Sequence, residues 1–141
     1  MAVRLAFHPR LYWSIEVLGG AAFLVYTGYV HGTGNLQPAL GRLEFDVAHD
    51  VFHALILVMS VAILAFLDDA RQARSALWWG AFYGAFGLSG FLAGGRLWSF
   101  VGIHLELQEN LVHAGAGAAG VAVGLLYQGF GGRLPTARPP A

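Results

Sequence analysis

The sequence contains no cysteine, and only 11% of its 141 residues are charged. The absence of cysteine excludes disulfides, thiolate metal ligands, iron–sulfur clusters and a thiol nucleophile. Soluble domains contain about 25% charged residues, so this chain has too few charges for a small soluble protein. Its 57% hydrophobic composition and its mean hydropathy of +0.59 predict instead that it lies in a lipid bilayer.

The few charges are also balanced, because eight basic residues, all of them arginine, stand against eight acidic residues. Surfaces that bind nucleic acid are strongly basic, so nucleic acid is not expected as a partner. The sequence has no G-x-S-x-G motif, no phosphate-binding loop and no nucleophile beside a base. It therefore indicates no reaction, and whether the protein is an enzyme stays open.

Four hydrophobic runs have the length of about 20 residues that a helix needs to cross the hydrocarbon of a bilayer. They cover residues 11–30, 47–67, 75–94 and 107–130. We therefore expect an all-α integral membrane protein, a four-helix bundle that forms one domain over residues 1–130. Residues 131–141, which hold three of the five prolines, are expected to form a flexible cytoplasmic tail.

The positions of the arginines predict the orientation of this bundle. Six of the eight lie before the first run, between the second and third runs, or after the fourth run, and the other two connections hold one each. By the positive-inside rule, both termini are expected in the cytoplasm, and the connections after the first and third runs face outward. The predicted location is the inner, cytoplasmic membrane, with several passes. The six arginines are Arg4, Arg10, Arg71, Arg74, Arg133 and Arg138.

The chain also repeats itself at an offset of about 60 residues. Under this shift His53 corresponds to His113, His49 to Glu109, Asp50 to Asn110 and Asp46 to Glu106. Repeats of this kind are common in membrane proteins. The sequence thus predicts two tandem helical hairpins with the same orientation in the membrane.

Each copy of the repeat carries a polar stripe, because positions i, i+3, i+4 and i+7 share one face of a helix. Both stripes begin at the outward end of a predicted span and descend two turns, so His53 and His113 are expected to lie deepest. The first stripe consists of Asp46, His49, Asp50 and His53, and the second of Glu106, Glu109, Asn110 and His113.

The second stripe, with Glu109-Asn110-Leu-Val-His113 followed by Ala-Gly-Ala-Gly-Ala-Ala-Gly, resembles a bacterial membrane family known as domain of unknown function 4383. The resemblance covers roughly residues 15 to 130. It implies four spans, with an acid or amide, then Asn-x-x-His, then a glycine-rich helix in each half. The first half departs from this pattern, with Asp50 in place of the asparagine and with His49 added. The family has no established activity, so the resemblance implies no reaction.

Imidazole and carboxylate groups on facing helices favour a site for a divalent transition metal. Such ligands suit Zn, Fe, Mn or Cu(II), whereas the lack of thiolates argues against Cu(I). The expected ligands are His49, His53, Glu109 and His113. The rest of the two stripes is expected to supply further ligands or partners that fix a histidine tautomer; these residues are Asp46, Asp50, Glu106 and Asn110.

Two other interpretations stay open at this point. The stripes can form a hydrogen-bonded network that joins the hairpins of a structural or accessory subunit, packed against other membrane subunits of a respiratory, photosynthetic or transport complex, or in a homo-oligomer. Acids in the first turn of a helix are also stabilising without any ligand. Alternatively, His53 and His113 can bind a b-type haem, although the carboxylates of the stripes argue against it. Glu16 is a separate candidate, because an acid inside a predicted span is by default functional or paired.

Overall fold

The computed structural model describes residues 8–33, 47–93, 97–101, 103 and 105–129, and these ranges contain helices and no strand. The prediction of an all-α protein is confirmed for them. The helices are α2 (Pro9–Thr33), α3 (Val47–Phe66), α4 (Asp69–Ala93), the short 3-10 helix η1 (Ser99–Val101) and α5 (Leu107–Gly129). One predicted site residue, Asp46, and the predicted tail, 131–141, lie outside the described ranges.

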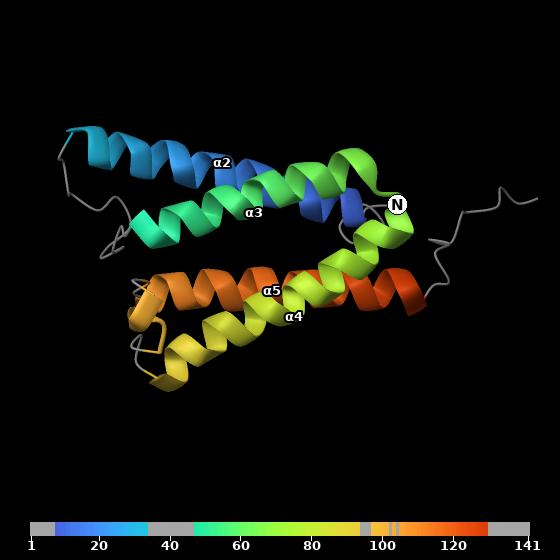
Figure 1. Ribbon diagram of the computed structural model, residues 1–141. Helices are drawn as coiled ribbons and strands as arrows, with labels where there is room; N and C mark the ends of the chain where they lie inside the picture. The colour runs from blue at the N-terminus through green and yellow to red at the C-terminus, as the bar shows by residue number, and fades with distance from the viewer. Residues whose placement is uncertain (1–7, 34–46, 94–96, 102, 104, 130–141) are drawn as a thin grey trace, which may run out of the picture.

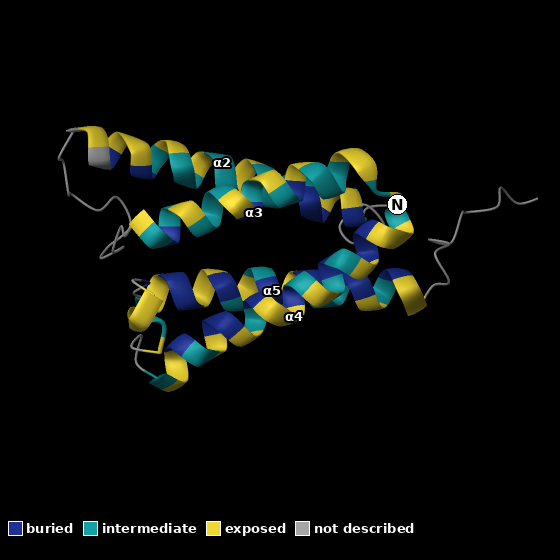
Figure 2. Cartoon of the chain, viewed as in Figure 1, coloured by how far each residue is buried: buried dark blue, intermediate teal, exposed yellow. Residues whose placement is uncertain are grey.

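The long helices form two pairs, and each pair follows the order of the chain. Helix α2 packs mainly against α3, and α4 packs against α5 along most of its length. Figure 1 shows the two pairs as two layers, with the short connection from α3 to α4 at the end where α2 begins. Buried positions concentrate on the helix faces that meet between and within these pairs, as Figure 2 shows.

Helices occupy all four predicted spans, but they differ in hydropathy. Among the described residues, α3 and α5 are long and apolar enough to cross a membrane. Helices α2 and α4 contain 25 residues each and are less apolar, because α2 includes Glu16 and α4 begins with a charged segment. Crossing of a membrane by all four helices therefore stays a prediction.

Helix α4 begins earlier than the sequence analysis predicts. A span was predicted to begin at residue 75, but the helix begins at Asp69. The reason is local: an Oδ1 atom of Asp68 accepts a hydrogen bond from the backbone N–H of Arg71 at 2.8 Å. An aspartate at this position satisfies a free N–H of the first turn, so the charged residues that follow continue as helix.

Glycines allow the backbones of α4 and α5 to approach closely. A Cβ atom added at Gly80 would lie 2.5 Å from the backbone nitrogen of Val121 and 2.6 Å from the carbonyl oxygen of Gly117. At Gly117 an added Cβ would collide with the backbone of Gly84. Small residues at such spacings permit this approach in membrane helices, and they set α4 and α5 as a tight pair.

At the end opposite the polar stripes, α2 is attached to the start of α4. Trp13 is fully buried, and its indole N–H donates to the carbonyl oxygen of Gln72 at 3.0 Å. Arg10 pairs with Asp69, with 2.7 Å between Nε and Oδ1. The two hairpins are thus held together at this end, and at the other end they meet at the histidines and where Phe52 of α3 packs on Phe86 of α4.

Candidate metal centre

Three histidines from two helices come together between the hairpins. His49 and His53 lie one turn apart on α3, so both side chains leave the same face of that helix. His113 reaches them from α5, with ring centroids 5.8 Å from His49 and 5.9 Å from His53. One ring nitrogen of each histidine lies within 4.8 Å of the other two.

The spacing of these nitrogens fits a metal ion that draws the third imidazole inward. Zn–N bonds of about 2.0–2.1 Å place two ligand nitrogens of a tetrahedral site roughly 3.4 Å apart. The Nε2 atoms of His49 and His53 are 3.1 Å apart, which is close to that value. For the same spacing, His113 would have to approach by up to about 1.4 Å from its limit of 4.8 Å.

Glu109 lies on the far side of His49 from His53. Its Oε1 atom is 3.7 Å from Nδ1 of His49, and both side chains are buried. Its Oε2 atom accepts the backbone N–H of Glu106 at 2.8 Å, which is the reciprocal half of a capping box at the start of α5. Glu109 thus lies beside His49 through Oε1, and its role as a direct metal ligand stays a prediction.

Aromatic side chains from the other two helices enclose the histidines. Phe23 of α2 lies 4.3 Å from His53 between ring centroids. Tyr83 and Phe86 of α4 meet the ring of His113 edge-on, at 4.9 Å and 5.2 Å. All four long helices thus contribute to the site. The sequence analysis missed these three residues, and no signal distinguishes them among ten phenylalanines and five tyrosines.

Three other predicted site residues that the structure describes lie outside the group of three histidines. Asn110 is buried against α4, where its amide contacts Gly90 so closely that no side chain fits there. Asp50 is half-buried in the first turn of α3, and Glu106 is half-buried just before α5. The structure thus brings together the histidines and Glu109, and it uses Asn110 to pack α5 against α4.

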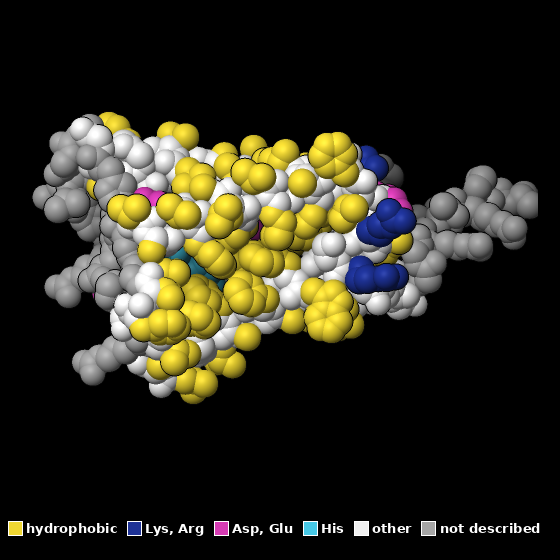
Figure 3. Space-filling model, viewed as in Figure 1, with side chains coloured by type: hydrophobic (Ala, Val, Ile, Leu, Met, Phe, Trp, Pro, Cys, Tyr) yellow, Lys and Arg dark blue, Asp and Glu magenta, His cyan; other side chains and the backbone are white. Residues whose placement is uncertain are grey.

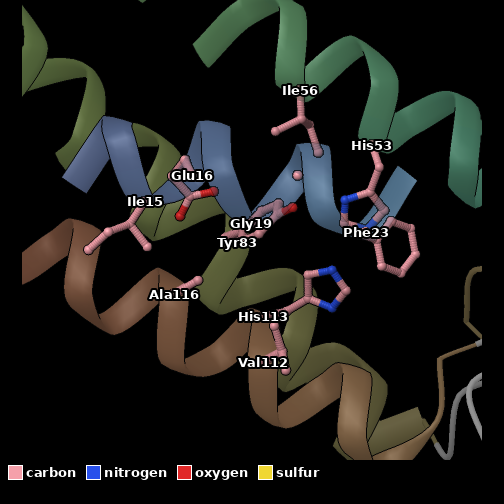
Figure 4. Close-up of a pocket in the computed structure, with 11 residues that line it drawn as sticks. Ile15, Glu16, Gly19, Phe23, His53, Ile56, Tyr83, Val112, His113 and Ala116 are labelled. Carbon is pink, nitrogen blue, oxygen red and sulfur yellow. The ribbon is translucent and has the colours of Figure 1, made fainter. Parts of the chain in front are cut away.

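Two adjoining cavities reach the histidines. The outer cavity has a volume of about 390 Å³ and includes Gln108 and Glu109, while the inner cavity, of about 280 Å³, extends from the histidines to Glu16 (Figure 4). In Figure 3, histidine surface is visible in a furrow flanked by hydrophobic side chains. Both cavities share a wall formed by Phe23, His53, Val112 and His113.

Comparisons with protein-family models, curated proteins and solved structures find no match for this chain. The resemblance of the second stripe to domain of unknown function 4383 therefore stays a prediction. The function is therefore inferred from the geometry of the histidine site itself.

Proposed function

We propose that this protein is a four-span inner-membrane protein that binds a divalent transition metal ion through His49, His53 and His113, with Glu109 orienting His49. One observation carries the proposal: three imidazoles from two different hairpins offer nitrogens within 4.8 Å of one another. Buried polar side chains are costly in an apolar environment unless they are paired or hold an ion. A shared metal ion satisfies all three at once.

The surface of α3 supports a position in the bilayer. Only 17% of its apolar window is buried inside the chain, whereas the core helix of a soluble protein would be mostly buried. A large apolar patch that stays exposed marks a surface for lipid or for another chain. The exposed hydrophobic residues of α3 are Val47, Val51, Leu55, Val58, Val61 and Phe66.

The distribution of charge supports the proposed orientation. Figure 3 shows the basic side chains of the described residues at the end of the bundle away from the histidines, and these are Arg10, Arg71 and Arg74. Arginines concentrate on the cytoplasmic side of membrane proteins. In this orientation the termini are cytoplasmic and the histidine site faces outward.

The ligand set narrows the choice of metal. Three imidazole nitrogens and no thiolate suit Zn, Fe, Mn or Cu(II). Three protein ligands leave a coordination position open, which is typical of sites that bind or activate a further molecule. The adjoining cavities provide space next to that position.

A structural role is the second candidate, and a specific contact favours it. The 3.1 Å between His49 and His53 is also the length of a hydrogen bond between two neutral imidazoles, which needs no ion. The histidines would then connect the hairpins of an accessory subunit in a larger respiratory, photosynthetic or transport complex. Haem is a third candidate, although Phe23 and Tyr83 occupy space beside the imidazoles.

The proposal is tested by elemental analysis of the full-length protein, purified in mild detergent. The visible absorption spectrum is recorded on the same sample. We expect about one equivalent of Zn, Fe, Mn or Cu per chain, and its loss in the double variant His53→Ala/His113→Ala. His8→Ala is the matched control, because His8 lies at the other end of the bundle near Asp69, and it should keep the metal.

The other outcomes separate the candidates. A folded wild-type protein that stays metal-free after incubation with Zn²⁺, Fe²⁺, Mn²⁺ and Cu²⁺ contradicts the metal site and favours the hydrogen-bonded network. An accessory subunit would in addition be extracted by mild detergent as part of a much larger particle. Strong absorbance in the Soret region would identify haem instead.

A further inference from the structure

The inner cavity has polar groups at its two ends and apolar walls between them. Figure 4 shows the imidazoles of His53 and His113 at one end and the carboxylate of Glu16 at the other. The apolar lining of the cavity includes Ile15, Ile56, Val112 and Ala116, and Gly19 and Gly20 leave further space on α2. The volume of about 280 Å³ is almost twice the roughly 150 Å³ that accommodates benzene in an engineered cavity.

The carboxylate of Glu16 has hydroxyl groups nearby but no cation. The hydroxyl group of Tyr12 hydrogen-bonds to it, and Tyr83 is close enough to interact with it electrostatically. Apart from the two histidines, none of the described residues that line the cavity is basic. A carboxylate has two oxygens and can accept several hydrogen bonds, so Glu16 can accept one from a ligand beside the one from Tyr12.

The cavity is bordered by the lipid-facing surface of the bundle. Ile15 of α2 and Val112 of α5 both line it, and they are 59% and 66% exposed. Both residues belong to long helices and not to a connection between helices. A molecule dissolved in the bilayer can therefore approach the cavity from the side.

We propose that the inner cavity binds a small lipid-soluble ring with hydrogen-bonding oxygens at opposite ends, the hydroquinone class. The hydroxyl group at one end donates to Glu16, and the oxygen at the other end bonds an imidazole, which can donate or accept according to its tautomer. Phe23 and Tyr83 offer aromatic surfaces to the ring. The proposal concerns binding alone and does not depend on a metal ion, so it goes beyond the function proposed above.

The probe is trimethylhydroquinone, kept reduced with ascorbate and titrated by calorimetry into the full-length protein in mild detergent, with protein-free micelles as the blank. The protein is measured after treatment with EDTA and again after addition of Zn²⁺, so that this test and the metal test can fail separately. Tetramethylbenzene is the matched ligand without oxygens. Phenethylamine tests whether Glu16 binds an organic cation instead.

Two kinds of variant test the Glu16 end of the inner cavity and the space inside the cavity. Loss of a hydrogen bond to a charged group should weaken binding by at least about tenfold in Glu16→Leu, whereas Glu16→Gln, which still accepts a hydrogen bond, should retain most of the affinity. Ala116→Leu should abolish binding by filling the cavity without removing a polar group. Ala119→Leu is its control, because Ala119 is exposed on the same helix and does not line the cavity.

The proposal is supported if trimethylhydroquinone binds to the wild-type protein, binds more weakly to Glu16→Leu and does not bind to Ala116→Leu. Four results would overturn it: no binding of the probe, equal binding of tetramethylbenzene, preferential binding of phenethylamine, or unchanged affinity in both Glu16→Leu and Ala116→Leu. The Ala116 variant keeps the test decisive if Glu16→Leu does not fold.

Discussion

At the scale of single residues, Glu109 uses its two carboxylate oxygens for different purposes. Oε2 accepts the backbone N–H of Glu106 and fixes the first turn of α5, and Oε1 faces Nδ1 of His49. A carboxylate next to a metal-binding histidine fixes its tautomer and makes the opposite nitrogen a better ligand. If the proposed metal site exists, the stability of the helix depends on an oxygen atom of Glu109, and the affinity for metal depends on the charge of the same side chain.

Glu109→Gln should separate these two roles. The amide oxygen can still accept the N–H of Glu106, but the negative charge beside His49 is lost, so we expect metal affinity to fall by about 10- to 100-fold with little change in stability. Glu109→Ala loses the cap as well and should lower the free energy of unfolding by about 1 kcal/mol. Competition titration with a chelating dye and thermal unfolding measure the two effects. If Glu109→Gln binds metal with wild-type affinity, the role of Glu109 is limited to capping helix α5.

At the scale of elements, the glycines of α5 differ sharply in what surrounds them. An added Cβ at Gly117 would meet the backbone of α4 at Gly84 and Gly80, whereas nothing lies within 4 Å of one added at Gly115. The two positions are two residues apart on the same helix. They form a matched pair for measuring how much the close approach of α4 and α5 contributes to the fold.

Gly117→Ala should separate α4 from α5 and destabilise the protein by about 1–3 kcal/mol, the usual cost of excess volume in a packed interface. Gly115→Ala should be neutral or stabilise by up to about 1 kcal/mol, because alanine has the higher helix propensity. Thermal unfolding in detergent, followed by circular dichroism, compares the two. Equal stability of both variants would contradict a tight α4–α5 interface.

The same helices show which parts of the fold can be predicted from the sequence alone. The helices at 47–66 and 107–129 follow directly from apolar runs, and helical periodicity places His49 and His53 on one face. The start of α4 was predicted wrongly, because apolar composition says nothing of the cap that Asp68 provides. The contacts of His53 with Phe23 and of Asn110 with Gly90 depend on how helices far apart in sequence pack, which no local pattern encodes.

At the scale of the whole molecule, the two hairpins are joined at both ends by different chemistry. Ion pairs and the Trp13 hydrogen bond connect α2 to α4 at the arginine-rich end, and imidazoles meet between α3 and α5 at the other. The inner cavity lies between these contacts and extends to Glu16. In the proposed orientation, the arginine-rich end lies in the cytoplasm and the histidines lie on the outward side.

That orientation can be tested with single introduced cysteines, because the sequence contains none of its own. Ala70 is exposed in the first turn of α4, and Phe100 is 78% exposed in η1. In intact cells, a membrane-impermeant maleimide should label Phe100→Cys and leave Ala70→Cys unlabelled until the membrane is broken, because four spans place these residues on opposite sides. Labelling in the reverse pattern would indicate the opposite orientation of the same four spans. Equal labelling of both in intact cells would contradict a bilayer crossing by α4, and with it the four-span arrangement on which the outward-facing metal site depends.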